Sequence, residues 1–436
     1  MVPLTTRIRW TSAVMATLAV GSSESFLLAP SKAPFYGHSA ARAASTAHAA
    51  STATTATTAA EGASAAFVPT PVAPQRISGG ELLSLDFDDL AKLLKGSGRA
   101  KMVWAALSQG VDPFSEAATE LEFLTPKTAA VLRENVQDLP WQVTRESVSS
   151  CGTRKLLVRL EDGLDVETVV IPDLTGSRLS TVCVSSQIGC AENCQFCMTG
   201  KMGLVRNLTA GEILGQVFFA RGTARKHGMP PLTNVVYMGM GEPLDNPAAV
   251  TRSLGLLTHP FAFAMAKSKI SVSTVGPSPA AIRRMKGMPS RLAWSVHAAT
   301  DDVRRVLVPT TVHTMIELRD AFAEVLESRP REHLFVEIVL IQGMNDSPEL
   351  ARALASLLRP LPRRASINLL PYNDAGHPVF RASSSEAVEE FQRVLNEEGF
   401  IATIRTARGD EESSACGQLA TSAKNERHRK RAVPPR

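Results

Sequence analysis

The most informative stretch of the sequence is Cys190-Ala-Glu-Asn-Cys194-Gln-Phe-Cys197. Its cysteines have the spacing C-x3-C-x2-C, and three thiolates so close on one loop indicate a soft metal centre. A structural zinc site normally has four protein ligands, often in two separated pairs, and no fourth partner is evident in the sequence. A four-iron cluster held by three cysteines would leave one iron open to a small molecule. We therefore favour an iron–sulfur cluster, with zinc or unligated buried thiols as the alternatives.

The chain around this loop alternates between strand-like and helical segments. Strands that alternate with helices predict a parallel sheet and an α/β fold. About six such units fit an open, partial barrel, whose chemistry lies at the carboxyl ends of the strands. A doubly wound sheet is the structural alternative. The predicted strands are 179–184, 234–238, 269–274, 292–297, 334–341 and 366–370, with amphipathic helices such as 210–221 and 347–358 between them.

Glycine-rich or polar residues follow several of these predicted strands. Strand 234–238 runs into Gly239-Met240-Gly241-Glu242-Pro243. Glycines there allow a ligand to approach the backbone closely, and a proline can open the next turn or helix. Ser273 ends one strand and Ser295-Val296-His297 ends the next. Taken alone, each of these segments is explained by an ordinary turn or loop start. At the rim of a barrel, the same residues are candidates for binding a ligand.

The composition indicates a globular protein with a mild positive charge. The 436 residues allow two or three domains at roughly 100–200 residues each. Hydrophobic residues make up 44% and charged residues 20%, which excludes a wholly disordered chain. No apolar run reaches the ~18 residues of a membrane-spanning helix, so no membrane association is expected. The 47 basic and 42 acidic residues give +5, too little alone to indicate nucleic acid. Six cysteines are too few for a disulfide scaffold.

Residues 1–76 have the composition of a targeting segment. They are rich in Ala, Ser and Thr, and Glu24 is the only acid in the first sixty residues. Such a segment cannot bury enough apolar surface to fold, and its acid-poor, Ser-rich, Arg-bearing character is typical of a transit peptide. The apolar patch 13–20 could be a signal-peptide core ahead of it. We expect import into a plastid, with the mitochondrion or the cytoplasm as alternatives, or an uninformative disordered tail.

Four further segments are expected after this leader. Residues 77–145 have a helical pattern and predict a small accessory domain. Residues 146–178 predict a β-hairpin extension, because β-branched runs flank the turn signal Glu161-Asp162-Gly163. Residues 179–420 form the predicted core. Residues 421–436 are a basic tail that binds phosphate or remains a solvated, disordered terminus.

Five stretches carry a resemblance to a known family. They are Ser185-Ser186-Gln187-Ile188-Gly189-Cys190 through Gly200, Arg206-Asn207-Leu208-Thr209 with Gly211-Glu212-Ile213, 238–244, Leu369-Leu370-Pro371-Tyr372-Asn373, and Arg408-Gly409-Asp410 with Ala415-Cys416-Gly417-Gln418-Leu419. Together they resemble the radical S-adenosylmethionine (SAM) adenine-C2 RNA methyltransferases of the dual-specificity type, over residues 82–420. The resemblance implies a partial (β/α)6 barrel and an accessory RNA-binding domain. It also implies methylation of an adenosine in large-subunit ribosomal RNA, which bacterial members extend to the adenosine 3′ of some tRNA anticodons.

The resemblance also implies roles for residues at matching positions. A 4Fe-4S cluster would be held by Cys190, Cys194 and Cys197. SAM would lie against Gly241, Glu242, Ser273, Ser295, Val296, His297 and Asn373. Cys416 matches the cysteine that carries the methyl group, Cys183 matches the resolving cysteine that forms a transient disulfide with it, and Glu167 matches the proposed proton acceptor.

Three positions depart from the family pattern. Val296 stands where many relatives have leucine, a change that should be harmless. Cys151 stands where an aspartate is common, and we expect a bystander thiol. The loop 172–181, which follows the Glu167 segment, is slightly longer than usual.

The chemistry of the reaction explains why these residue types are needed. An adenine C2–H is neither acidic nor nucleophilic, so polar methyl transfer cannot reach it and a carbon radical is required. The family scheme uses two molecules of SAM: one methylates the Cys416 thiolate, and one generates the radical that activates that methyl group. A base, Glu167 or Cys183, removes the ring proton. Cys183 then releases the product by forming a disulfide with Cys416.

The scheme implies partners, and it leaves rival functions open. It needs an electron donor such as ferredoxin or flavodoxin, a thiol reductant, and ribosomal RNA or tRNA as substrate; a monomer is the default. Methylation of carbon 8, or another radical modification of RNA, is the alternative within the superfamily. A noncatalytic iron–sulfur protein that binds RNA or senses redox state is the alternative from another class.

Overall fold

The computed structural model describes residues 76–174, 176–363, 365–373, 377–405 and 417–419. Its first elements are short helices whose buried side chains, among them the fully buried Trp104, belong to the main hydrophobic core. Ser78 and Glu81 form a capping box at the first helix, and Thr125 caps the fifth directly before Pro126. These helices are α1 (Gly79–Leu82), α2 (Phe87–Leu93), α3 (Ser97–Ser108), α4 (Ala117–Glu120) and α5 (Pro126–Asn135).

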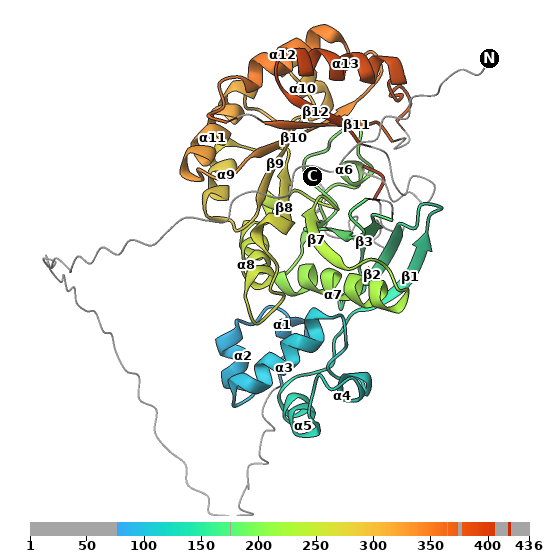
Figure 1. Cartoon of the computed structure of the whole chain (residues 1–436), viewed down its shortest axis with the longest axis vertical. Helices are drawn as coiled ribbons and strands as arrows, with labels where there is room; N and C mark the ends of the chain where they lie inside the picture. Colours follow the sequence, from blue (N-terminus) through green and yellow to red (C-terminus); the bar gives the residue numbers. More distant parts are fainter. Residues whose placement is uncertain (1–75, 175, 364, 374–376, 406–416, 420–436) are drawn as a thin grey trace, which may run out of the picture. The chain divides into compact units, whose positions relative to one another are not determined.

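One sheet organises the rest of the described chain (Figure 1). Its strand order is β1-β2-β3-β4-β7-β8-β9-β10-β11-β12. Strands β1 to β4 pair antiparallel, and every pair from β4 to β12 is parallel. The strands are β1 (Gln142–Val148), β2 (Arg154–Arg159), β3 (Asp165–Pro172), β4 (Ser180–Val184), β7 (Leu232–Tyr237), β8 (Ile270–Thr274), β9 (Arg291–Ser295), β10 (Leu334–Leu340), β11 (Ser366–Pro371) and β12 (Ile401–Ile404).

The parallel strands lie side by side in the order in which they occur along the chain. A doubly wound sheet would instead reverse its order at a switch point, so that alternative is wrong. The predicted α/β class with a mainly parallel sheet is confirmed. Within the described residues β1 and β12 are the two edges, which makes the sheet open, as in a partial barrel.

Helices follow the parallel strands and cover their outer side. In Figure 1, α7, α8, α9, α11, α12 and α13 succeed one another around the outside of the strands. The helices are α6 (Met198–Met202), α7 (Ala210–Lys226), α8 (Pro247–Thr258), α9 (Pro279–Arg283), α10 (Asp301–Leu307), α11 (Met315–Ser328), α12 (Pro348–Leu358) and α13 (Ser385–Glu397), with 3-10 turns η1 (Pro243–Asp245), η2 (Lys267–Lys269) and η3 (Arg284–Gly287). A small ladder of β5 (Gln187–Ile188) and β6 (Arg206–Asn207) flanks the cysteine loop. No helix in these described segments has the length and apolarity needed to cross a membrane.

The main differences between the structure and the sequence prediction are at β9, β1 and β12. Strand β9 ends at Ser295, two residues earlier than predicted, because His297 takes a left-handed conformation with φ 50°. Strand β1 begins at Gln142, inside the range 77–145 predicted as helical, and ends at Val148, inside the predicted extension 146–178, so the antiparallel part has three strands before β4. Strand β12 was not predicted.

Candidate active site

A cavity of about 150 Å³ opens at the carboxyl ends of β7 to β11. Tyr237, Ser295 and Pro371 are the last residues of β7, β9 and β11, and all three line it. This is the edge at which a parallel partial barrel is expected to place its chemistry. The predicted site residues that line the cavity are Cys190, Cys194, Cys197, Gly241, Glu242, Ser273, Ser295, His297 and Asn373. Val296 is fully buried beside them and is not part of the lining.

The cysteine loop is bound, on the side away from the cavity, to α10 and the residues that follow it. The amide of Gln195 donates to the carbonyl of Leu307 at 2.9 Å. Thr310 Oγ1 donates to the carbonyl of Glu192 at 2.8 Å. Cys194 and Phe196 pack with Leu307 in a small apolar cluster. These contacts fix the loop with its three cysteines bordering the cavity.

The thiols of this loop suit a metal centre better than they suit isolated cysteines. Burial raises the pKa of Cys194, and the charges of Cys197 and Cys190 raise it further. Burial also raises the pKa of Cys190. A bound metal cation offsets the cost of burying a thiolate, because a coordinating thiol is deprotonated outright. Within the described residues no three His, Cys, Asp or Glu side chains converge on a point that one metal ion could occupy. A cluster does not need such convergence, because each cysteine binds a different iron.

The Gly239–Pro243 turn borders the cavity, and its backbone packs closely against Gln187. Gly241 has φ 97°, and a Cβ there would lie 2.5 Å from the Cβ of Gln187, so glycine is required. The side chain of Gln187 accepts the amide of Glu242 at 2.8 Å. The Glu242 carboxylate in turn accepts the amides of Leu244 and Val275, each at 2.9 Å. Burial raises the pKa of Glu242 to about 8.

A row of polar side chains crosses the strands at the cavity. The hydroxyls of Ser273 on β8 and Ser295 on β9 lie 2.9 Å apart. Glu337 on β10 pairs in register with Ser295 and with Asn368 on β11. Its carboxyl group hydrogen-bonds Asn368 and Ser273, and burial raises its pKa. Sequence reasoning missed Glu337, although a single acid inside the apolar run 334–341 was a usable signal.

His297 lines the cavity as a neutral imidazole. Its Nδ1 accepts the amide of Val339 at 3.2 Å, so the ring hydrogen is on Nε2. Burial, and secondarily the charge of Arg304, lower the pKa of His297 to about 3. The ring packs edge-on against Phe196 with centroids 4.6 Å apart, and Asn345 holds the His297 carbonyl at 2.8 Å.

Cys183 and Glu167 lie on one face of the antiparallel part of the sheet. Thr168 Oγ1 donates to Gln216 on α7 at 2.7 Å, so Thr168 faces that helix. Side chains alternate along a strand, and Glu167 therefore points to the opposite face. Cys183 on β4 is the register partner of Val169, which shares the face of Glu167. Neither Cys183 nor Glu167 is among the residues that line the cavity.

The segment after Cys416 returns to the cysteine loop. Cys416 itself lies outside the described residues, but Gly417 lines the cavity. The carbonyl of Gly417 accepts the amide of Met198 at 2.7 Å, and that of Leu419 accepts Thr199 Oγ1 at 2.6 Å. Gly417 has φ 84°, and a Cβ there would lie 3.2 Å from the carbonyl oxygen of Phe196. This close approach brings the chain next to Cys416 against the loop of Cys197.

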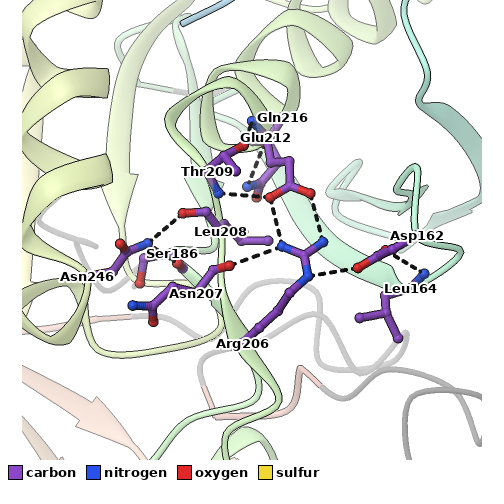
Figure 2. Close-up of polar contacts among 10 residues, drawn as sticks. All are labelled: Asp162, Leu164, Ser186, Arg206, Asn207, Leu208, Thr209, Glu212, Gln216 and Asn246. Carbon is purple, nitrogen blue, oxygen red and sulfur yellow. Dashed lines mark hydrogen bonds and ion pairs between the residues drawn. The ribbon is translucent and has the colours of Figure 1, made fainter. Parts of the chain in front are cut away.

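Arg206 on β6 is bound to the β2–β3 turn and to α7, as Figure 2 shows. Its guanidinium donates to Asp162 in the β2–β3 turn at 2.8 Å and to both oxygens of Glu212 on α7, at 2.7 and 2.9 Å. Its neighbour Asn207 accepts a hydrogen bond from Gln187 at 2.8 Å. Because Gln187 also binds the amide of Glu242, a continuous chain of contacts runs from Asp162 to the cavity.

Comparisons with known proteins agree with this arrangement. Residues 184–354 match the radical SAM superfamily. Relatives from Marinobacter nauticus, Marinomonas sp. and Alcanivorax borkumensis, each described as the dual-specificity RNA methyltransferase RlmN, are 42%, 41% and 39% identical. These matches span 74%, 64% and 66% of this chain and 86%, 76% and 76% of the relatives.

The crystal structure of a radical SAM methyltransferase from Sphaerobacter thermophilus is also similar. Its TM-score is 0.70 at 36% identity, over 77% of this chain and 98% of that one. The match to the radical SAM superfamily implies a 4Fe-4S cluster and SAM as cofactors, and the cysteine loop supplies suitable ligands. The chain belongs to the RlmN family of radical SAM RNA methyltransferases.

Proposed function

We propose that this enzyme methylates carbon 2 of an adenosine in large-subunit ribosomal RNA, and the adenosine 3′ of tRNA anticodons as well. One observation carries the proposal. A single cavity at the carboxyl ends of the parallel strands is lined by the three loop cysteines, by Glu242, and by Gly417, the residue after Cys416. The relatives described as dual-specificity RNA methyltransferases support the choice of RNA as substrate.

The cavity has the groups that the two cofactors need. Cys190, Cys194 and Cys197 would ligate the cluster, which together with SAM supplies the radical chemistry that an unreactive ring C–H requires. The SAM pocket would be formed by Gly241, Glu242, Ser273, Ser295, His297 and Asn373, with Val296 buried beside them. A buried carboxylate such as Glu242 suits the ammonium group of the methionine moiety. Gly241 leaves the backbone open to close approach.

Cys416 and Cys183 would carry and release the methyl group. The Cys416 thiolate takes a methyl group from one SAM and becomes S-methylcysteine. After the activated carbon has bonded to the base, the adduct would lose the ring proton and one electron, which the cluster held by the loop cysteines would accept. The Cys183 thiolate then attacks the sulfur of Cys416. An S–S bond forms, the S–C bond breaks, and its electron pair stays on the carbon, which gains a proton. A thiol reductant then returns the disulfide to two thiols. The position of Gly417 at the cavity supports this role for Cys416.

Glu167 would accept the proton that the adenine ring loses. It is buried on the same face of the sheet as Cys183, in the neighbouring strand. The ammonium group of Lys155 lies 3.4 Å from its carboxylate, which compensates for the burial of that charge. Lys155 would therefore position Glu167 and hold it ready for proton transfer.

The remaining parts of the chain would serve import into the organelle and binding of the RNA substrate. Residues 1–76 would be a plastid transit segment, and residues 77–145, with the hairpin 146–178, would lead RNA to the core 179–420. The basic tail 421–436 would add affinity for phosphate. A ferredoxin or flavodoxin would supply electrons to the monomeric enzyme.

Anaerobic reconstitution followed by assay on unmodified ribosomal RNA and tRNA tests this function. We expect cleavage of SAM under dithionite and 2-methyladenosine in the digested RNA, identified by chromatography with mass spectrometry. A product methylated at carbon 8 would transfer the proposal to that reaction. A loaded cluster without any cleavage of SAM would overturn it in favour of a noncatalytic protein.

A further inference from the structure

Arg304 is the one lysine or arginine of the described residues that is buried, with 1% of its surface exposed. It lies on α10, behind the ends of β8 and β9. Its Nη1 donates to the carbonyl oxygens of Val296 at 2.8 Å and Ser295 at 3.3 Å, and its Nη2 donates to that of Val275. Its buried Nε has no acceptor among the described residues. The guanidinium is therefore enclosed and bound to carbonyl groups only.

This positive charge has no ion-pair partner within the described segments. Burial lowers the pKa of Arg304, and the negative charges that oppose this shift are Cys194 first, then Glu192 and Glu242. A buried cation is costly unless an anion lies nearby, so the cysteine loop is the natural counterpart of Arg304.

The location of Arg304 is fixed by the same contacts that fix the cysteine loop. The carbonyl of Leu307, one turn further along α10, accepts the amide of Gln195 inside that loop. Arg304 does not line the cavity, although Val275 and Ser295, whose carbonyls it binds, both do. It therefore lies behind the residues that line the cavity and acts on the cysteine loop from there.

We infer that Arg304 is a built-in countercharge for the iron–sulfur cluster and sets its reduction potential. A cluster gains negative charge when it is reduced, and a fixed positive charge in a low-dielectric wall stabilises that reduced form. Arg304 makes the cluster easier to reduce by the protein's electron donor. It is a positioning residue that works through electrostatics and through the strand ends it binds. The inference rests on the proposed role of Cys194 as a cluster ligand.

The test is the midpoint potential of the reconstituted, full-length enzyme, followed by electron paramagnetic resonance during redox titration. Arg304→Gln keeps a hydrogen-bond donor and removes the charge, and its midpoint potential should be more negative than that of the wild type. Arg304→Lys keeps the charge and should stay close to the wild type. Arg305→Gln is the matched control: it removes the same charge from the same helix, but Arg305 is exposed and pairs with Asp302. Its potential should not change.

Equal potentials for Arg304→Gln and the wild type, with full iron content, would overturn the inference. If Arg304→Gln does not fold, Arg304→His measured at pH 8 replaces it, since a neutral imidazole also lacks the charge. A wild-type midpoint potential in Arg304→His at pH 8 would also overturn the inference. A purely structural role predicts weaker SAM binding in both the Lys and the Gln variant with no difference between their potentials. An intact cluster in a Cys190→Ala/Cys194→Ala/Cys197→Ala variant would instead show that the ligand assignment is wrong.

Discussion

The backbone amide of Val275 donates a hydrogen bond of 2.9 Å to Oε2 of Glu242. Glu242 follows β7 and Val275 follows β8, so this bond joins the ends of two neighbouring parallel strands at the cavity. The other carboxylate oxygen is occupied by the amide of Leu244. Glu242 therefore shapes the rim of the site in addition to its proposed contact with SAM.

Glu242→Gln should change how the stability of the enzyme depends on pH. Burial raises the pKa of Glu242 to about 8 in the folded state, against about 4.3 in an unfolded chain. Between these values the folded state binds more protons than the unfolded state, so wild-type stability falls as pH rises. Glutamine does not titrate, so the stability of the variant lacks this dependence on pH. From pH 5.5 to 8.5 the wild type should lose roughly 2–3 kcal/mol relative to the variant.

Urea unfolding of the anaerobic, SAM-free proteins at both pH values measures this difference. A gap between the two proteins that does not change with pH would show that Glu242 is ionised throughout. SAM binding gives the functional counterpart, measured by calorimetry. The variant should bind SAM at least about tenfold more weakly, because a charge-assisted hydrogen bond is lost.

The central strands could be predicted from sequence because each combines a buried apolar run with a following amphipathic helix. Strand β10 (Leu334–Leu340) falls inside the predicted range 334–341. Strand β12 (Ile401–Ile404) has one buried residue in four, and β1 (Gln142–Val148) has none. Both are edge strands, which lack the buried faces that produce a readable hydrophobic pattern.

The site residues that could be predicted are likewise those whose signal is local in the sequence. The cysteine loop and the Gly241 turn were predictable because their spacing lies within a few residues. The role of Gln187 was not, because it comes from contacts between distant segments. Glu337 was visible as a lone acid in an apolar run, but its partners are set by strand register. The proposed roles of Cys416, Cys183 and Glu167 remain predictions from the family resemblance, and Cys416 lies outside the described residues.

Gly215→Ala should loosen the packing of Trp141 on α7. A Cβ at Gly215 would lie 2.6 Å from the indole ring, and Trp141 is buried, so the ring must shift. Overpacking of this kind costs about 1–3 kcal/mol. Gly255→Ala on α8 is the matched control, because that glycine is exposed and a Cβ there meets nothing within 4 Å. It should stabilise the protein by about 0.5–1 kcal/mol. Equal effects of the two variants on urea unfolding would disprove the packing argument.

Arg206→Ala should weaken SAM binding although Arg206 does not line the cavity. The change breaks the contacts to Asp162 and Glu212 (Figure 2). It also leaves Asn207, and through it Gln187, less well held. We expect a loss of about 2 kcal/mol in unfolding free energy, since charge-assisted hydrogen bonds at a partly buried carboxylate are lost. Arg305→Ala, which removes an exposed arginine, should change neither stability nor SAM affinity. A wild-type dissociation constant for SAM in Arg206→Ala would show that the chain of contacts to Glu242 carries no influence.

Cys183→Ala should trap RNA covalently on the enzyme. Without the Cys183 thiolate, the bond between the Cys416 sulfur and the methylene carbon cannot be broken, so the adduct accumulates during turnover. Denaturing gels with labelled RNA, together with mass spectrometry of the digested adduct, measure this outcome. Cys416→Ala should give neither adduct nor methylated product, because no methyl carrier is left. Cys151→Ala is the cysteine control on the antiparallel extension and should methylate RNA as the wild type does. Methylation by Cys416→Ala, or clean turnover by Cys183→Ala, would contradict the proposed path of the methyl group.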